Sequence, residues 1–178
     1  MSVGEARESV VMRIAAERPW LLLILVRLLD MGGGTFTVRD VAEPLGLRSY
    51  VVERGLWWLK KYGFVEEVPG TVPRRYRLKS VEDPKIVDLR TYRWICGNTT
   101  VIQLGDIYVV LINRGEEVIA RTIHRNIVEA VREAIERHGI ARDVKELSRF
   151  TGLQPPVVAT ALRVLDTLVC RREQREKQ

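Results

Sequence analysis

An internal repeat limits the folds open to this chain more than any other feature. Residues 21–59 can be laid on residues 127–165, at an offset of 106 positions, without a gap. Gly46 then falls on Gly152, and the apolar positions of three successive helical segments coincide. Core positions and turn glycines are what two copies of one small fold retain. We therefore expect two copies of one architecture built from three helices.

Local patterns predict the individual elements. Apolar spacing, N-cap residues and terminal glycines predict three helices in each copy. Two β runs around a Pro-Gly-Thr-Val-Pro loop predict a hairpin after the third helix of the first copy, and four short Val- and Ile-rich runs lie between the copies. The expected helices span 21–31, 38–45, 49–62, 125–138, 143–151 and 155–169, and the expected strands span 64–68, 74–78, 92–96, 100–104, 107–112 and 118–122.

Composition argues against an enzyme. The chain has 178 residues, 46% of them hydrophobic, which is typical of a globular protein. Its two cysteines and two histidines leave too little material for a disulfide framework, a four-cysteine zinc site or a catalytic triad. The sequence contains no phosphate-binding loop, nucleophile elbow or zinc-binding motif. We therefore expect no catalytic residues, no cofactor and no metal.

The hydropathy pattern predicts no membrane segment. The longest apolar run, Leu21–Val26, is far shorter than the roughly 20 residues that span a bilayer. It also begins too far into the chain, behind too many charges, for a signal peptide. We expect a cytoplasmic protein, and the abundance of Arg and Glu over Asn and Gln favours a thermophilic source. Cys96 and Cys170 are then either buried thiols or a disulfide pair, and the sequence leaves both open.

The first copy carries a family resemblance. The segment VRDVAEPLGLRSYVVERGLWWLKKYGFVEEVPGTVPRRYRLK has a short helix, a glycine turn, a longer helix and a two-stranded wing. Over residues 20–79 it resembles the winged helix-turn-helix superfamily, and the tandem arrangement resembles DNA-binding transcriptional regulators of archaeal type. The second copy, VKELSRFTGLQPPVVATALRVLDTLVCRR, resembles the same unit over about 124–172 but leaves no room for a full returning wing strand.

These patterns lead to one expected architecture. We expect an α+β fold that is mainly α, with two winged-helix-like three-helix units joined by a small antiparallel β segment. The expected divisions are 1–79 for an N-terminal helix and the first unit, 80–123 for a linker and the β segment, and 124–178 for the second unit.

The helix expected over 49–62 carries the candidate site. Helical spacing places Val52 and Leu56 on an inward face, and it places Tyr50, Arg54, Trp57 and Lys61 on the opposite face. The resemblance implies that this outward face enters the major groove of DNA, led by its N-terminal residues. Arg54 then suits guanine and Glu53 suits cytosine. The predicted DNA-binding residues are Arg48, Ser49, Tyr50, Glu53, Arg54, Trp57, Lys61, Arg74, Arg75 and Arg77.

The wing supplies the remaining cations of that set. Strand alternation places Arg75 and Arg77 on one face, with Tyr76 and Leu78 on the other. Arg74 lies at the end of the loop. The net charge of the chain is only +6, so the clustering of charge matters more than its total. Phosphate contacts from such residues orient a protein on DNA and supply much of its affinity.

The second copy predicts a different role. Its equivalent outward positions, Pro156, Thr160, Arg163 and Thr167, are nearly uncharged, so they suit phosphate poorly. We expect a regulator of transcription that binds double-stranded DNA, functions as a homodimer and has a possible protein partner at the second unit. The alternative is a tandem winged-helix module for protein interactions in a transcription or chromosome-maintenance complex, which the outward Trp57 favours.

Overall fold

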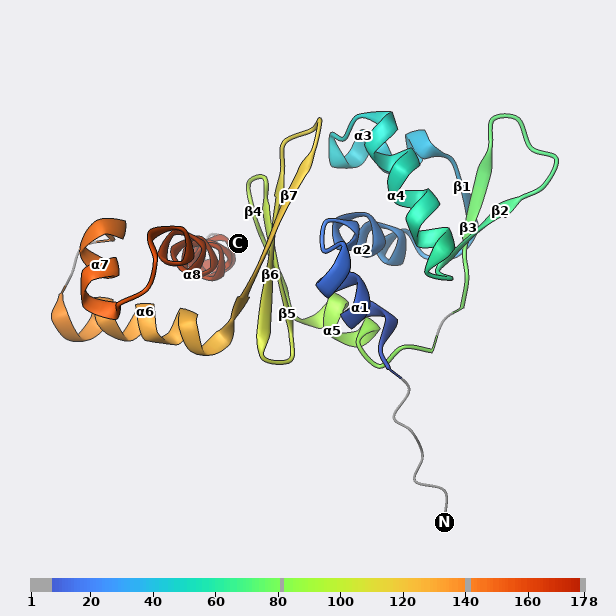
Figure 1. Ribbon diagram of the computed structural model, residues 1–178. Helices are drawn as coiled ribbons and strands as arrows, with labels where there is room; N and C mark the ends of the chain where they lie inside the picture. Colours follow the sequence, from blue (N-terminus) through green and yellow to red (C-terminus); the bar gives the residue numbers. More distant parts are fainter. Residues whose placement is uncertain (1–7, 81, 140–141, 177–178) are drawn as a thin grey trace, which may run out of the picture. The chain divides into compact units, whose positions relative to one another are not determined.

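The structure is a computed structural model, and it describes residues 8–80, 82–139 and 142–176. The chain divides into two compact units, Met1–Arg90 and Thr91–Gln178. Figure 1 labels the helices and strands of both units. The first unit ends later than the expected boundary at residue 79, because the segment after it packs with the N-terminal helix.

The first unit combines helices with a small sheet. Its three strands pair antiparallel in the order β1-β3-β2, so the hairpin formed by β2 and β3 adds to the short strand β1. Figure 1 shows α4 beside this hairpin. The elements are α1 (Val10–Glu17), α2 (Leu21–Met31), β1 (Thr35–Phe36), α3 (Val38–Leu45), α4 (Ser49–Lys61), β2 (Val65–Val68), β3 (Arg75–Leu78) and α5 (Ile86–Thr91).

Helix α2 is the centre of this unit. Eight of its eleven residues are buried, as expected for a helix that is apolar on nearly every side. The inward side chains of α4, including Leu56 and Leu59, are fully buried as well. Gly55 allows the two helices to approach closely, because a Cβ at this position would lie 2.2 Å from Cδ1 of Ile24. The α4 backbone therefore packs directly on α2.

Both ends of α3 are fixed by local chemistry. Thr37 and Asp40 form a capping box, in which the Thr37 backbone N–H donates to the Asp40 carboxylate over 2.8 Å. These hydrogen bonds from Thr37 hold the pKa of Asp40 below its usual value, since they favour the ionised form. At the other end Gly46 takes a left-handed conformation with φ of 63°. The turn between α3 and α4 is thereby set.

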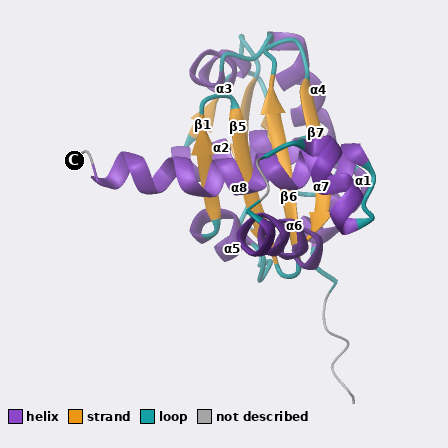
Figure 2. Ribbon diagram, turned by 90° about the vertical axis from the view of Figure 1, so that its left-hand side faces the viewer, coloured by secondary structure: helices purple, strands orange, loops and turns teal. Residues whose placement is uncertain are grey.

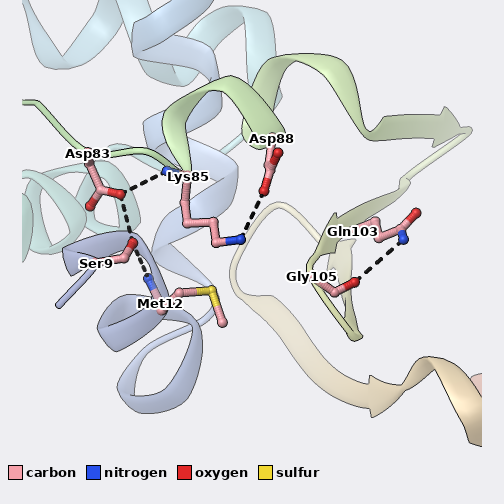
Figure 3. Close-up of polar contacts among 7 residues, drawn as sticks. All are labelled: Ser9, Met12, Asp83, Lys85, Asp88, Gln103 and Gly105. Atoms are coloured by element: carbon pink, nitrogen blue, oxygen red, sulfur yellow. Dashed lines mark hydrogen bonds and ion pairs between the residues drawn. The ribbon is translucent and has the colours of Figure 1, made fainter. Parts of the chain in front are cut away.

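A buried carboxylate joins the segment after the hairpin to the N-terminal helix. The Asp83 side chain, 9% exposed, accepts hydrogen bonds from the Ser9 hydroxyl at 2.7 Å and from the backbone N–H groups of Val11 and Lys85 at 3.0 Å each. Figure 3 shows Asp83 between Ser9 and Lys85, and it also shows the Gln103–Gly105 bond of the second unit. One side chain thus caps the start of α1 and orders the start of α5.

We predict that Asp83→Ala lowers the free energy of unfolding by about 2–3 kcal/mol, because one buried and two partly buried donors lose a charged acceptor. Asp88→Ala is the matched control, since Asp88 pairs only with Lys85 at 3.3 Å near the surface among the contacts described. The control should cost about 0.5 kcal/mol. Urea denaturation followed by circular dichroism measures both, and equal losses in the two variants would contradict this role for Asp83.

The second unit packs its first and third helices on one face of a four-stranded antiparallel sheet, and its second helix packs on those two. The sheet is a meander in the order β4-β5-β6-β7, and Figure 2 shows α8 running across its strands. Val101, Tyr108, Val110 and Ile123 of the sheet share one core with side chains from all three helices. The elements are β4 (Arg93–Cys96), β5 (Thr99–Leu104), β6 (Ile107–Asn113), β7 (Val118–His124), α6 (Arg125–His138), α7 (Val144–Thr151) and α8 (Pro155–Glu176).

The expected fold class is wrong. Among the described residues there are eight helices and two antiparallel sheets of three and four strands, not two mainly helical three-helix units joined by a small β segment. The strands β4–β7 do not form a joining segment, because Val101 and Val110 supply part of the core on which α6, α7 and α8 pack. Local periodicity predicts the helices, but it does not say which element covers their apolar faces.

The helices of the two units nevertheless keep the same spacing. Helix α7 begins and ends 106 residues after α3, and α8 begins 106 residues after α4. Gly152 takes a left-handed conformation with φ of 71°, as Gly46 does in the first unit. The units differ after the third helix, because α4 is followed by a hairpin whereas α8 continues to Glu176.

A disulfide joins the sheet of the second unit to its longest helix. Cys96 in β4 and Cys170 in α8 are bonded, with their Cα atoms 5.9 Å apart and 74 positions between them in the sequence. Such a crosslink restricts the unfolded chain more than the folded one. The structure therefore decides the question that the sequence left open.

We predict that the double variant Cys96→Ser/Cys170→Ser loses about 4 kcal/mol of unfolding free energy in the second unit, the loop-entropy value for a closure of this length. Guanidinium denaturation under non-reducing conditions measures the loss. A dithiol reductant should lower the midpoint of the unaltered protein and leave that of the double variant unchanged. Identical midpoints before and after reduction would show that the crosslink does not stabilise the unit.

No single helix within the described parts of the chain is both long and apolar enough to cross a membrane, although the bent pair α7 and α8 passes the same length and composition test together.

Candidate nucleic-acid interface

Helix α4 has one buried and one exposed face. Val52, Leu56 and Leu59 are fully buried against the core. On the opposite side Tyr50 is 59% exposed and Trp57 is 53% exposed, which is unusual for large aromatic side chains. The packing on α2 thus fixes which side chains α4 presents outward.

Aromatic rings support the cations of this outward face. The Arg54 guanidinium lies 5.1 Å from the centre of the Trp20 ring, and the Lys61 ammonium lies 5.1 Å from that of Trp57. Trp57 in turn meets Trp58 edge to face, with ring centres 4.8 Å apart. Cation–π contacts of this kind hold a charged group in place while leaving it accessible. We call the exposed residues Tyr50, Arg54, Trp57 and Lys61 the outer strip of α4.

A groove lies beside this strip, between α4 and the hairpin. Its volume is about 620 Å³, and its walls come from the start of α3, from α4 and from the β2–β3 hairpin. Both apolar and charged side chains line it, including three cations and two carboxylates. The lining residues are Thr37, Val38, Arg39, Ser49, Glu53, Leu56, Trp57, Lys60, Glu67, Pro73, Arg74 and Tyr76.

One carboxylate connects two cations of the groove. Oε2 of Glu67 lies 3.8 Å from Nζ of Lys60, and Oε1 lies 3.6 Å from Nε of Arg74. The Lys60 and Arg74 side chains are 54% and 76% exposed, so both can change partner at little cost. Glu67 thus lowers the net positive charge of the groove, while the two cations remain exposed to solvent.

Arg75 and Arg77 lie on the other face of the sheet. Tyr76, between them on β3, lines the groove, and residues alternate between the faces of a strand. Nη1 of Arg75 lies 3.3 Å from Oγ1 of Thr35, whereas Nη2 of Arg77 lies 2.7 Å from Glu66. The structure therefore separates these two arginines from Arg74.

All ten residues predicted from the sequence are exposed, and all except Arg48 fall in three places. Tyr50, Arg54, Trp57 and Lys61 form the outer strip, whereas Ser49, Glu53, Trp57 and Arg74 line the groove, and Arg75 and Arg77 face away from it. Arg48 is the N-cap residue of α4 and forms no side-chain cap hydrogen bond.

Sequence reasoning missed part of the groove. Lys60 and Arg39 line it, and Glu66 and Glu67 pair with cations of the hairpin and α4. Helical spacing from Ser49 and Glu53 places Lys60 on the same face of α4, so the sequence contains a signal for this residue. The pairing of Glu67 was not, because it depends on how β2 faces α4.

On α8, the face equivalent to the outer strip of α4 is buried at one position, whereas Pro156 and Arg163 on the same face are exposed. Thr167, which lies 106 positions after Lys61, is 2% exposed, and Nη1 of Arg163 lies 3.4 Å from Oγ1 of Thr99 in β5. A smaller cavity of about 360 Å³ at this place is lined by both Cys96 and Thr99. Asp166, the equivalent of Lys60, pairs with Arg142. This face of α8 therefore contacts its own sheet near Arg163 and Thr167 and is exposed elsewhere.

Comparisons with known proteins return nothing for this chain: no protein-family model, no curated protein and no solved structure matches it.

We predict that Trp57→Ala changes the unfolding free energy by about 1 kcal/mol or less, because more than half of its surface is already in water. Leu56→Ala, one position earlier on the same helix, should cost about 2–5 kcal/mol, because it leaves a cavity in the core. Thermal denaturation compares them. A loss of similar size in both variants would mean that Trp57 serves the core and is not available to a ligand.

Proposed function

We propose that the first unit binds double-stranded DNA, with α4 in the major groove and the β2–β3 hairpin on the neighbouring backbone, and that the protein regulates transcription. The observation that carries this proposal is the outer strip of α4, where a helix of 13 residues exposes Arg54 and Lys61 beside two aromatic rings. An α-helix of this kind fits the major groove, and cations beside it meet phosphate.

The order of elements adds support. A strand, two helices joined at Gly46 and a hairpin that returns to the first strand follow the helix α2 in the first unit. This order resembles the winged helix-turn-helix arrangement, in which the second helix of the pair reads DNA. The residues proposed for base edges are Arg48, Ser49, Tyr50, Glu53 and Arg54. Trp57 and Lys61, further along α4, are proposed for sugar and phosphate contacts.

Variants of these residues test the proposal. Arg54→Ala and the pair Arg74→Ala/Arg75→Ala should each weaken binding to duplex DNA at least tenfold, because each removes charged contacts worth about 1.5–3 kcal/mol apiece. Arg137→Ala is the control, since it removes one exposed cation from α6 of the second unit, where Arg137 lies near Glu133. Fluorescence anisotropy with a pool of random duplexes measures affinity. Binding of all variants equal to that of the control would refute the proposal.

The dependence on salt gives a second prediction. If Lys61, Arg74 and Arg75 each meet a phosphate, the logarithm of the binding constant should fall against the logarithm of salt concentration with a slope of about −2.7. The same anisotropy assay at several salt concentrations measures the slope. A slope near zero with measurable affinity would point to an uncharged mode of recognition.

A protein partner is the second candidate function. The exposure of Trp57 and the pairing of Arg77 with Glu66 favour it, because aromatic side chains with few unpaired charges are typical of protein interfaces. Recovery of one stoichiometric protein from a nuclease-treated extract, lost on Trp57→Ala but not on Arg74→Ala, would favour this candidate over DNA.

We propose further that the protein is a cytoplasmic homodimer. Two copies of α4 on one duplex gain affinity from two half-sites. The equivalent face of α8 carries little charge, which leaves the second unit for contacts other than DNA, including a protein partner. A disulfide such as Cys96–Cys170 is rare in the cytoplasm of mesophiles but frequent in that of hyperthermophiles, which agrees with a thermophilic source. Sedimentation equilibrium distinguishes monomer from dimer.

A further inference from the structure

The Glu67 carboxylate lies between two cations, in the position that an anionic group of a ligand would take. Its two carboxylate oxygens face two different cations, Lys60 of α4 and Arg74 at the end of the hairpin loop. A phosphate group presents oxygens in the same way to the same kinds of donor. The three side chains all line the groove between α4 and the hairpin.

We infer that Lys60 and Arg74 form a subsite for one phosphate of the nucleic-acid backbone, and that Glu67 occupies this subsite until a phosphate displaces it. The inference rests on the proposed function and adds two residues, Lys60 and Glu67, that the sequence did not assign. Glu67 then lowers the affinity of the protein for DNA. It competes with phosphates of DNA that is bound only weakly and non-specifically, and it is displaced when α4 already holds the DNA in the major groove.

The contacts are suited to such an exchange. Both N–O distances exceed 3.5 Å, and all three side chains are at least one third exposed, so the carboxylate is held by charge and not by burial. Exposed ion pairs of this kind are weak. The Glu67 carboxylate has the advantage of belonging to the same chain as Lys60 and Arg74. A phosphate gains a comparable advantage when α4 already holds the duplex that carries it, so it can displace the carboxylate.

The neighbouring acid offers a matched control. Glu66 lies one position earlier on β2, so its side chain is on the opposite face of the strand. It pairs with Arg77 at 2.7 Å, outside the groove. Glu66→Gln and Glu67→Gln therefore change the net charge equally, on the same strand, and differ in whether the groove gains charge.

Anisotropy with a fluorescent duplex of random sequence, about 30 base pairs or roughly three helical turns long, tests the inference. Glu67→Gln should bind roughly three- to tenfold more tightly than the unaltered protein at low salt, and its salt slope should be steeper by about one. Glu66→Gln should change affinity by less than about twofold. Weaker or unchanged binding of Glu67→Gln, or an equal gain in both variants, would overturn the inference.

A second measurement separates this inference from the proposed function. Inorganic phosphate is titrated into each protein while the side-chain NMR signals of Lys60 and Arg74 are followed. Saturation at lower phosphate concentration in Glu67→Gln than in Glu66→Gln supports the subsite even if no variant binds the duplex, in which case only the proposed function fails. Lack of any duplex binding together with identical titrations would remove both.

Discussion

The packing of α4 on α2 is the constraint on which the candidate site depends. The close approach at Gly55 and the burial of Leu56 and Leu59 orient α4 about its own axis. Once that rotation is fixed, Tyr50 and Trp57 must point away from the core, because residues on opposite sides of a helix cannot both be inward. The outward display of aromatic and cationic groups is thus a consequence of core packing.

In the second unit, helices equivalent to α3 and α4 pack in one core with a different sheet. Helices α7 and α8 repeat the spacing of α3 and α4, and Gly152 repeats the turn at Gly46. In this unit, however, the sheet precedes the helices and lies against the face of α8 that carries Arg163 and Thr167. The position that carries the exposed Lys61 in the first unit is thus the buried Thr167 in the second, although Arg163 on the same face of α8 is exposed.

Charge pairing modifies the electrostatics that the sequence suggests. The arginines of the β2–β3 hairpin suggest a strongly positive surface, but Glu66 and Glu67 of β2 neutralise part of this charge. Arg77 is paired outside the groove, whereas Arg74 shares Glu67 with Lys60 inside it. Exposed pairs of this kind add little stability, so their main effect is on the field that a ligand meets.

The sequence by itself determined the turn glycines, the exposed face of α4 and the helices other than α5 (Ile86–Thr91), which lies in the segment expected as a linker. Spacing of apolar residues specifies which side of a helix is buried, and Gly46 and Gly152 mark the turns because few other residues adopt their conformation. It also determined that Arg75 and Arg77 share one face of β3, since strand residues alternate.

Only the tertiary structure decided what covers each helix. The expectation of two mainly helical units failed because strands 93–124 contribute one wall of the second core, and no local pattern states which face of a helix a distant sheet will meet. The Cys96–Cys170 bond and the contacts of Glu67 with Lys60 and Arg74 have the same origin. Each requires that residues far apart in the chain come within a few ångströms, which depends on the packing of whole elements.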